Sequence, residues 1–432
     1  MTLNVLIASG QWGIGGTEKA AELLLRNLGS DFNAYGAGLH RGGARADSLL
    51  EDEYDIYFPD DSDDFANYLQ NNAIDIIHSH SGDPELISEA AAKAGTPIVV
   101  RTDQFGRYFQ PDNGKVIDYF FFPSQSILLR TLMLNQISLE EDWPRKMGLL
   151  YNPLDIDNVS QGMSMRSRYN IPETAPVVGK IGRPAPEKWG KLTIDAFDRV
   201  VKSVPNAQLF LVGVPDKIKN AIQSYGWGHK VTYEGVLPPD KVKDFYATID
   251  VLAHTSAIGE SYGYVIAEAM ANGVVPVVDS TPMRDNAQIE LVNHGHSGYV
   301  ANSPQSYGEA ITKLLNDNKL RRQFGKAAGI RVNRFSVQNV VSRLEDYYRR
   351  LSAERGLISD SDPVSLTYTS QRNSLLNFAD GNNKRLNQSF GDDDVFHWLE
   401  RQSWRCVTSL PIGRKPTFDL LRKGFIVANE RI

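Results

Sequence analysis

Cysteine is almost missing from this sequence, and its scarcity excludes two kinds of structure. Cys406 is the only cysteine among the 432 residues. A single thiol can form no disulfide within the chain and no thiolate metal cluster. Because disulfides accumulate in oxidising compartments, their absence favours a reducing, cytoplasmic setting.

Long apolar runs are missing as well. No run reaches the ~18 apolar residues that a membrane-spanning helix needs. Residues 1–8 lack the basic region that opens a signal peptide, and we predict that they form a first β-strand. We therefore expect a cytoplasmic protein that contacts a membrane, if at all, only at its inner face.

An excess of positive charge is the third absence. The formal net charge is −6, whereas proteins that bind nucleic acid through its phosphates are usually basic. We expect no nucleic-acid partner. What the sequence does contain is an ordinary globular composition, 41% hydrophobic and 23% charged, over a length that suits two domains.

Short apolar runs alternate with helical patterns in both halves of the sequence. Strands separated by helix-length segments predict βαβ units and parallel sheets, which bind ligands at the carboxyl ends of their strands. We predict an α/β protein with two doubly wound, Rossmann-like domains. The expected strands are residues 4–9, 74–78, 97–101 and 119–122 in the first half and residues 177–181, 208–212, 231–234, 251–254 and 274–278 in the second.

A polar stretch at residues 155–170 predicts the link between the two domains. We place the N-terminal domain at residues 1–165 and the C-terminal domain at residues 166–336. A helix at 337–352 is expected to pack back on the N-terminal domain. Residues 356–432, rich in Asn, Ser and Asp, predict an irregular C-terminal extension of unknown role.

Basic and aromatic residues gather at the end of this extension. Such a segment can bind anionic lipid headgroups, so it predicts peripheral contact with an anionic membrane. A solvated or self-docked tail is the alternative. The residues concerned are Trp398, Trp404, Arg414, Lys415, Arg422 and Lys423.

Two glutamates stand on either side of an expected helix start. Glu260 precedes the helix in a polar loop, Gly263 opens the helix, and Glu268 lies inside it. The unpaired N–H groups of a first helical turn favour a phosphate. Together with two carboxylates for hydroxyl groups, they suit a sugar–phosphate–ribose ligand. The alternative is a surface helix that carries two glutamates.

Cations follow the first strand of the C-terminal domain. Arg183 leaves the strand end, and Lys188 follows across a proline-stiffened loop. Two fixed cations at this place could neutralise a diphosphate and stabilise charge on a leaving group. An ordinary basic loop is the alternative.

Glycines and histidines follow two strands of the N-terminal domain. Gly15 and Gly16 precede a helix, where backbone can approach a phosphate or sugar closely; a tight turn is the alternative. Their spacing is not that of a dinucleotide site. His78 and His80 face the same way, but no third metal ligand is indicated. We predict a hydrogen-bonding role for one of them and a structural role for the other.

In this combination the chain resembles the retaining glycosyltransferases of the GT-B fold called family 4, or group 1. Each motif alone is of moderate specificity, whereas their order along the chain is specific. The matching segments are residues 15–18, 77–80, 151–155, 182–188, 260–271, 273–278 and 290–300.

The resemblance implies two Rossmann-like domains that face a central cleft. It also implies retaining transfer of a hexose-type sugar from a nucleotide diphosphate sugar, UDP- or GDP-linked, to an acceptor hydroxyl. The acceptor would be a sugar, a lipid-linked molecule or another glycoconjugate precursor. No cofactor and no metal are expected, because Arg183 and Lys188 supply the positive charge.

The resemblance also implies a role for each site residue. Arg183 and Lys188 would bind the diphosphate and stabilise it as it leaves. Glu260 would hold hydroxyls of the donor sugar, Glu268 those of the ribose, and His80 would contact the sugar near the reacting centre. The remaining donor contacts would come from Gly15, Gly16, Tyr262, Gly263 and Tyr264.

Two departures from the family pattern concern the acceptor side and the cation loop. The family often carries a His-Asp pair where this sequence has residues 101–104. That histidine is absent, so Arg101 and Asp103, together with His78, are candidates to line the acceptor side of the N-terminal domain. Trp189 stands where a small residue is common.

Other functions remain alternatives. The carboxylate pair of a glycosidase would flank the glycosidic bond, but Glu260 and Glu268 are better explained as binding groups. A catalytically silent nucleotide-sugar-binding subunit would keep the same residues. A phosphorylase or an epimerase of the same fold is a further alternative.

Overall fold

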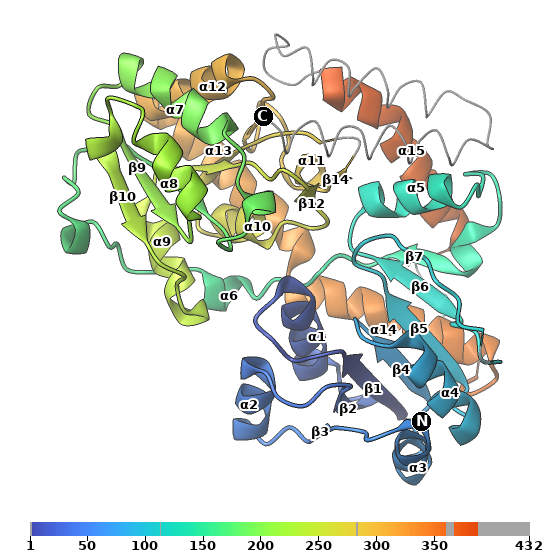
Figure 1. Cartoon of the computed structure of the whole chain (residues 1–432). Helices are drawn as coiled ribbons and strands as arrows, with labels where there is room; N and C mark the ends of the chain where they lie inside the picture. Colours follow the sequence, from blue (N-terminus) through green and yellow to red (C-terminus); the bar gives the residue numbers. More distant parts are fainter. Residues whose placement is uncertain (1, 113, 282–283, 360–366, 388–432) are drawn as a thin grey trace. The chain divides into compact units, whose positions relative to one another are not determined.

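The computed structural model describes residues 2–112, 114–281, 284–359 and 367–387. The chain divides into two compact units (Figure 1). The N-terminal unit comprises Met1–Leu154 and Phe335–Asn377, and the C-terminal unit comprises Asp155–Arg334 and the residues from Phe378 onward. The basic end of the extension, from Trp398 to Lys423, lies outside the described residues.

The N-terminal unit is built on one parallel sheet. Its described strands follow the order β3-β2-β1-β4-β5-β6-β7. Their bounds are β1 Leu3–Ser9, β2 Phe32–Gly38, β3 Ile56–Tyr57, β4 Ile76–Ser79, β5 Ile98–Thr102, β6 Tyr119–Phe122 and β7 Met147–Leu149. The helices are α1 Gly16–Asn27, α2 Ala44–Glu51, α3 Ser62–Asn71, α4 Pro84–Ala94, α5 Gln125–Leu134, η1 Trp143–Arg145 and α14 Val337–Glu354, and α15 Tyr368–Asn387 begins here.

The C-terminal unit repeats this plan. Its main sheet is also parallel and follows the order β10-β9-β8-β11-β13-β15. The strands are β8 Val177–Ile181, β9 Gln208–Val212, β10 Val231–Glu234, β11 Val251–His254, β13 Val275–Val278 and β15 Tyr299–Val300; β12 Gly259–Glu260 pairs separately with β14 Asp285–Asn286. The helices are α6 Ile156–Val159, η2 Ser167–Tyr169, η3 Pro186–Lys188, α7 Leu192–Ser203, α8 Asp216–Ile222, η4 Gly228–Lys230, η5 Pro239–Lys241, α9 Val242–Thr248, α10 Tyr264–Ala271, α11 Gln288–Leu291, α12 Pro304–Asn316, α13 Asn318–Val332 and η6 Asn333–Phe335.

Local sequence explains where the longer helices begin. Asp83 accepts hydrogen bonds from the first amides of α4, Pro84 occupies its first turn, and Gly95 ends it at φ +73°. Ser303 and Ser306 cap α12 reciprocally. A capping side chain satisfies backbone donors that a helix start leaves unpaired, and glycine adopts the left-handed conformation at little cost.

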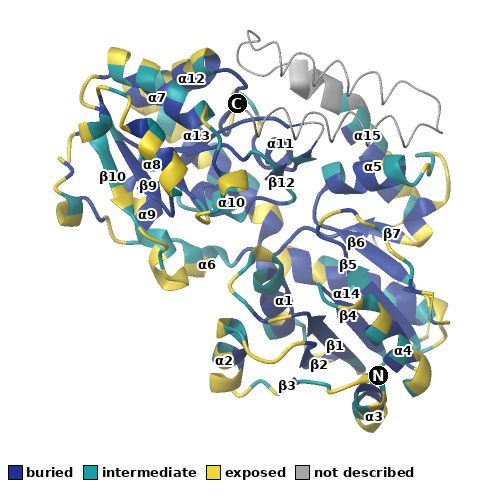
Figure 2. Cartoon of the chain, in the orientation of Figure 1, coloured by how far each residue is buried: buried dark blue, intermediate teal, exposed yellow. Residues whose placement is uncertain are grey.

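Both sheets reverse their strand order at one point. In the N-terminal unit this point lies between β1 and β4, and in the C-terminal unit it lies between β8 and β11. The strands themselves are buried, as Figure 2 shows for the centre of each sheet. The loops that leave the carboxyl ends on either side of such a switch point form a crevice that binds ligands.

The division between the units comes earlier than the sequence indicates. Residues 155–165, expected at the end of the N-terminal domain, belong to the C-terminal unit. The amides of Met163 and Met165 donate to Asp244 and Thr248, both at 2.8 Å. These bonds fix the segment on α9. Helix α14 belongs to the N-terminal unit.

The extension is less irregular than expected, because residues 368–387 form helix α15. Its first turns are anchored on the N-terminal unit by Gln371, whose Oε1 accepts a hydrogen bond from Tyr347 at 3.0 Å, and by the buried Leu375. Arg350 lies over the ring of Tyr368 at 4.6 Å. The few apolar anchors give a weak helical period, so the sequence pattern missed this helix.

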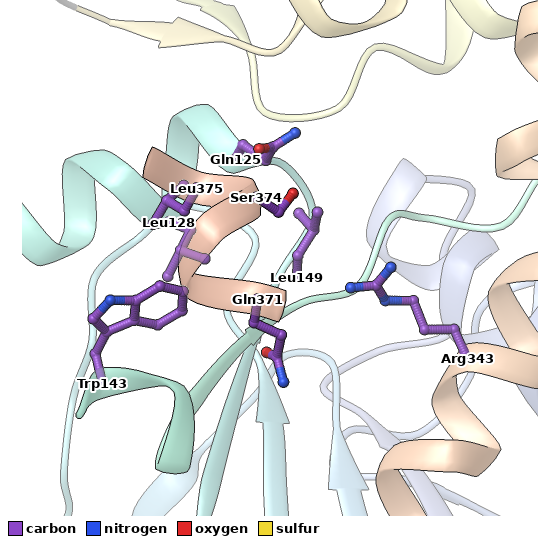
Figure 3. A pocket seen from close by; sticks show the side chains of 8 residues that line it. All are labelled: Gln125, Leu128, Trp143, Leu149, Arg343, Gln371, Ser374 and Leu375. Carbon is purple, nitrogen blue, oxygen red and sulfur yellow. The ribbon is translucent and has the colours of Figure 1, made fainter. Parts of the chain in front are cut away.

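A small cavity lies beside α15 in the N-terminal unit. Figure 3 shows Trp143 and Leu128 close to the α15 residues Gln371 and Leu375. Its volume of about 20 Å³ suits a water molecule rather than a sugar. The lining residues are Gln125, Leu128, Trp143, Leu149, Arg343, Gln371, Ser374 and Leu375.

Candidate active site

The switch point of the C-terminal unit brings together Lys188 and Glu260. Lys188 lies in the loop that follows β8, and Glu260 lies in the loop that follows β11. Lys188 Nζ is 3.0 Å from Glu260 Oε1. His254, at the end of β11, donates to the same oxygen from Nε2 at 3.0 Å.

The second oxygen of Glu260 remains open. Glu260 Oε2 accepts no hydrogen bond from the described residues, and the side chain is 14% exposed. One oxygen therefore fixes the orientation of the carboxylate, while the other can accept a hydroxyl hydrogen from a ligand.

The environment keeps Glu260 ionised and His254 neutral. Burial alone would raise the pKa of Glu260, but the Lys188 charge and the His254 hydrogen bond bring that pKa to about 2. Burial lowers the pKa of His254, although Glu260 opposes the shift. The site thus holds a carboxylate, an ammonium group and a neutral imidazole at neutral pH.

Two glycines shape the backbone around Glu260. Gly259 has φ +73°, and a Cβ there would lie 1.7 Å from the carbonyl oxygen of Asp285. Gly263 has φ +99° and forms the N-cap of α10. As a glycine, it offers no side-chain acceptor to the first amides of the helix. The start of α10 therefore presents a backbone end of the kind that favours an anion.

Glu268 is held by a tyrosine that the sequence did not indicate. Glu268 is buried in α10, and its Oε2 accepts a hydrogen bond from the Tyr246 hydroxyl at 2.9 Å. Burial and the neighbouring carboxylate raise the pKa of Tyr246 well above 10. Tyr246 thus stays protonated and fixes the direction of the Glu268 carboxylate.

Arg183 is the exposed cation of the site. It follows β8, and its side chain makes no hydrogen bond or ion pair with the described residues. Its carbonyl accepts a hydrogen bond from Trp189 Nε1 at 2.8 Å. Trp189 is 5% exposed, so this departure from the family pattern anchors the loop that carries both cations.

Residues before and after Glu260 in the chain make further contacts that hold its loop. The Glu260 amide donates to Oε1 of the fully buried Gln288 at 3.3 Å. Tyr262 is buried and its ring contacts Tyr264 edge-on at 4.9 Å. Gln288, His254 and Tyr246 were missed by sequence reasoning, because each lies outside the motif and reaches it only through the fold.

The switch point of the N-terminal unit distinguishes the two histidines. His78 is fully hydrogen-bonded: Nδ1 lies 2.6 Å from the Tyr348 hydroxyl and Nε2 lies 2.7 Å from Thr102 Oγ1. The ring nitrogens of His80 have no hydrogen-bond partner among the described residues, although its side chain is only 3% exposed. Buried polar atoms are normally paired, so His80 is the histidine with unused capacity for a ligand.

Burial makes both histidines neutral. It lowers the pKa of His78 well below 6.5, with a contribution from His80. It lowers the pKa of His80 to about 3, with a contribution from Arg101. His78, which we expected on the acceptor side, instead uses both ring nitrogens for hydrogen bonds inside the N-terminal unit.

Arg101 and Asp103 have different surroundings. Arg101 is half-buried, and its Nη1 is buried without a partner among the described residues. Asp103 accepts hydrogen bonds from the amides of Phe105 at 3.1 Å and Tyr108 at 2.6 Å. Asp103 therefore shapes the loop after β5, whereas Arg101 keeps donors available.

The glycine segment after β1 makes a close backbone approach. A Cβ on Gly10 would lie 2.9 Å from Cα of Gly82, so the two loops of this switch point touch through their backbones. Gly15 is the N-cap of α1, and Gly16 is its first residue. As a glycine, Gly15 also offers no side-chain acceptor to the first amides of its helix.

The described residues form neither a metal-binding cluster nor a membrane-spanning helix. No group of three or more His, Cys, Asp or Glu side chains in the described part of the chain could hold a metal ion. None of the described helices combines the length and the apolar character needed to cross a membrane.

Comparison with known proteins identifies the family. Residues 164–331 match the family described as Glycosyl transferases group 1. The C-terminal unit is thus similar to group 1 glycosyltransferases over this segment. The match covers most of the C-terminal unit, including Arg183, Lys188, Glu260 and Glu268. The family predicted from the motif order is confirmed.

Solved structures confirm the GT-B fold. A glycosyltransferase from Rickettsia africae gives a TM-score of 0.68 at 15% identity, over 81% of this chain and 98% of that one. Anabaena HepE, solved with UDP and glucose, gives 0.63 at 18% identity, over 81% of this chain and 100% of that one.

A curated relative matches over part of its length. The D-inositol 3-phosphate glycosyltransferase of Corynebacterium urealyticum is 23% identical over 266 residues. The alignment covers 57% of this chain and 62% of the relative. The chain thus spans less than two thirds of that protein.

Proposed function

We propose that this protein is a retaining glycosyltransferase that moves a hexose-type sugar from a nucleotide diphosphate sugar to an acceptor hydroxyl. The observation that carries the proposal is Glu260. One oxygen is held by Lys188 and His254 while the other is open, at the switch point of a unit that matches group 1 glycosyltransferases. A carboxylate that is fixed through one oxygen and open at the other can accept a hydrogen bond from a hydroxyl of the donor sugar.

The diphosphate would meet positive charge and backbone donors. Lys188 and Arg183 supply the charge, and the uncapped start of α10 supplies N–H groups. On donor binding, Lys188 can turn from Glu260 toward a phosphate oxygen. Charge stabilisation of the leaving diphosphate by these groups supports a reaction without a metal or another cofactor.

The nucleoside and the sugar would be held at opposite ends. Glu268, oriented by Tyr246, is suited to accept hydrogen bonds from ribose hydroxyls. His80, in the N-terminal unit, has two unpaired ring nitrogens for the donor sugar. Because both glutamates serve as binding groups, we propose front-face substitution, in which the departing phosphate takes the proton of the incoming hydroxyl and the configuration is retained.

Positioning then accounts for most of the proposed catalysis. A neutral His80 with a pKa of about 3 cannot act as a strong base at neutral pH, so its role is to hold and orient. Orientation of a bound donor and acceptor replaces an encounter between free molecules. Arg101, with its unpaired Nη1, is the acceptor-side residue best supplied with free donors.

The biological setting is also a proposal. The matched relatives include an enzyme named for inositol phosphate glycosylation, which supports a role in glycoconjugate synthesis. HepE, solved with UDP and glucose, supports UDP as the donor nucleotide, with GDP as the alternative. We propose a cytoplasmic location with peripheral contact at the inner face of the membrane, carried by the basic end of the extension.

A donor panel tests the proposed function. Thermal unfolding of the full chain is measured with UDP, GDP, ADP and their sugars, since a ligand of the folded state raises its stability. We expect one nucleotide family to stabilise the protein, with nucleotide release on addition of acceptor, also in EDTA. NMR of the product should show the donor's anomeric configuration.

Three outcomes would separate the alternatives. Stabilisation without any sugar transfer would favour a silent binding subunit, and turnover that depends on inorganic phosphate would favour a phosphorylase. An inverted product would remove the retaining mechanism.

A further inference from the structure

Lys180 is a lysine in the interior of the C-terminal unit, and no motif of the sequence indicated it. It lies in β8 beside the switch point and is 2% exposed. Its ammonium group donates to the carbonyl oxygen of Thr255 and lies 3.2 Å from Thr255 Oγ1. The ring of Trp189 lies 5.0 Å from the ammonium nitrogen. Burial of a cation is costly, so its presence requires a physical reason.

The contacts of Lys180 connect the two loops of the donor site. Thr255 begins the segment that leads from β11 to Glu260. Trp189 follows Lys188, and its Nε1 donates to the Arg183 carbonyl at 2.8 Å. The Lys180 ammonium group therefore binds one loop through a carbonyl oxygen and the other through the face of an aromatic ring.

Charged groups from several elements face Lys180. Asp279 after β13 and Glu260 in β12 favour its charged form, whereas Lys188 in η3 disfavours it. The Lys180 charge also lowers the pKa of His254, at the end of β11, and this imidazole is neutral. Burial is the largest influence and lowers the pKa of Lys180 to about 8. Lys180 is thus mainly a cation at pH 7 and loses its charge as the pH rises through 8.

We propose that Lys180 is a positioning residue that holds the Arg183–Lys188 loop and the Thr255–Glu260 segment in the arrangement that binds the donor diphosphate. Lys180 acts through Trp189 and Thr255. The positive charge of Lys180, close to the proposed donor site, also favours binding of the negatively charged diphosphate. The inference rests on the proposed function, because it concerns the same donor site.

The proposal gives donor binding a specific dependence on pH. Protonated Lys180 donates to Thr255 and lies against Trp189 as a cation; deprotonated Lys180 loses both charge-assisted contacts. If binding requires the charged form, affinity falls about tenfold between pH 7 and pH 9, because a group with a pKa of about 8 is roughly 10% protonated at pH 9.

Two variants of the full chain test this dependence. Calorimetric titration with UDP, GDP and ADP between pH 6.5 and 9 gives the Kd of the nucleotide that binds. In Lys180→Met, which keeps the side-chain length without the charge, we expect binding that is more than tenfold weaker and independent of pH. In Lys180→Arg, which stays charged, we expect tight binding without loss near pH 8. Each variant is also assayed for the KM of the nucleotide sugar and for kcat.

A matched control uses Lys202, which lies at the exposed end of α7 and, among the described residues, forms an ion pair with Asp198 alone, at 2.7 Å. Lys202→Met should keep the affinity and the pH dependence of the unmodified chain. Thermal unfolding of each variant reports whether the protein is folded.

The outcomes separate this inference from the proposed function. If the unmodified chain binds no nucleotide diphosphate, the proposed function fails. If it binds one but Lys180→Met keeps its affinity, or Lys180→Arg keeps the loss near pH 8, the role of Lys180 is wrong and the function stands. Should Lys180→Met not fold, Lys180→Arg alone decides, because it differs from lysine in its pKa and not in its charge at pH 7.

Discussion

Removing Lys188 should destabilise the C-terminal unit in a pH-dependent manner, because it leaves Glu260 buried without its cation. In the intact site Lys188 and His254 hold the pKa of Glu260 at about 2 instead of its ordinary 4.5. In Lys188→Met the carboxylate must stay charged in the interior or take up a proton. For a carboxyl with a pKa near 4.5, taking up a proton costs about 3 kcal/mol at pH 7. At pH 5 the same protonation costs less than about 1 kcal/mol.

The sign of the effect follows from the direction of the shift. A depressed pKa in the folded state contributes stability above the unfolded value of 4.5, and this contribution disappears as the pH falls through 2. That contribution is still present at pH 5, so Lys188→Met should lose stability at both pH 7 and pH 5. The loss should be about 2–3 kcal/mol smaller at pH 5, because protonation of the unpaired Glu260 costs that much less there.

A second substitution tests whether the buried charge is the cause. In Lys188→Met with Glu260→Gln, the unpaired charge is gone, so about 2 kcal/mol of stability should return at pH 7. Neither variant should transfer sugar, because the cation and the carboxylate are both part of the proposed donor site. Stability is measured by urea titration with hydrogen exchange of peptides from β8 and β11, which report on this unit.

An exposed pair provides the control. Lys219 Nζ lies 3.2 Å from Asp216 Oδ1 on α8, where the side chains are 43% and 88% exposed. Lys219→Met should change stability by less than about 0.5 kcal/mol at either pH. The reasoning is refuted if Lys188→Met loses as much stability at pH 5 as at pH 7, or if the double variant is no more stable than the single one.

Two further predictions concern residues that support the donor. Tyr246→Phe removes the hydroxyl that orients Glu268, and we expect about tenfold weaker nucleotide binding by calorimetry, since a hydrogen bond to a charged group is worth about 1.5–3 kcal/mol; an unchanged Kd would contradict this role. His80→Leu should lower kcat about 100-fold, as for loss of a positioned donor. It should keep the Tm, because no described group bonds to its ring nitrogens; a full kcat would rule out the sugar contact.

Buried parallel strands were well predicted by the sequence. The bounds of β6, β8, β9 and β11 agree with the apolar runs, because a strand covered on both faces is apolar throughout. Strand β2 was missed, since its sequence contains two glycines. A Cβ on Gly36 would lie 2.3 Å from Ile56 Cδ1, and one on Gly38 would lie 2.6 Å from Phe58. These glycines are required by packing against a later segment, which local pattern does not reveal.

The donor site was predictable to the extent that its residues lie in continuous motifs. Glu260, Gly263 and Glu268 occupy one short stretch, where the spacing itself indicates a carboxylate before a helix and another inside it. The residues that orient them were not predictable. Tyr246 comes from α9 and His254 from the end of β11, so only folding brings them to Glu268 and Glu260.

The sequence by itself indicated two parallel-sheet domains, a resemblance to a family, and the carboxylates and cations of the proposed donor site, because apolar period and motif spacing are local properties. It could not choose between His78 and His80, which have the same local surroundings and face the same way. The tertiary structure shows which of the two has hydrogen-bonding groups to spare. Tyr348, 270 residues further along the chain, occupies one nitrogen of His78, and Thr102 occupies the other, which leaves His80 with its ring nitrogens unpaired among the described residues.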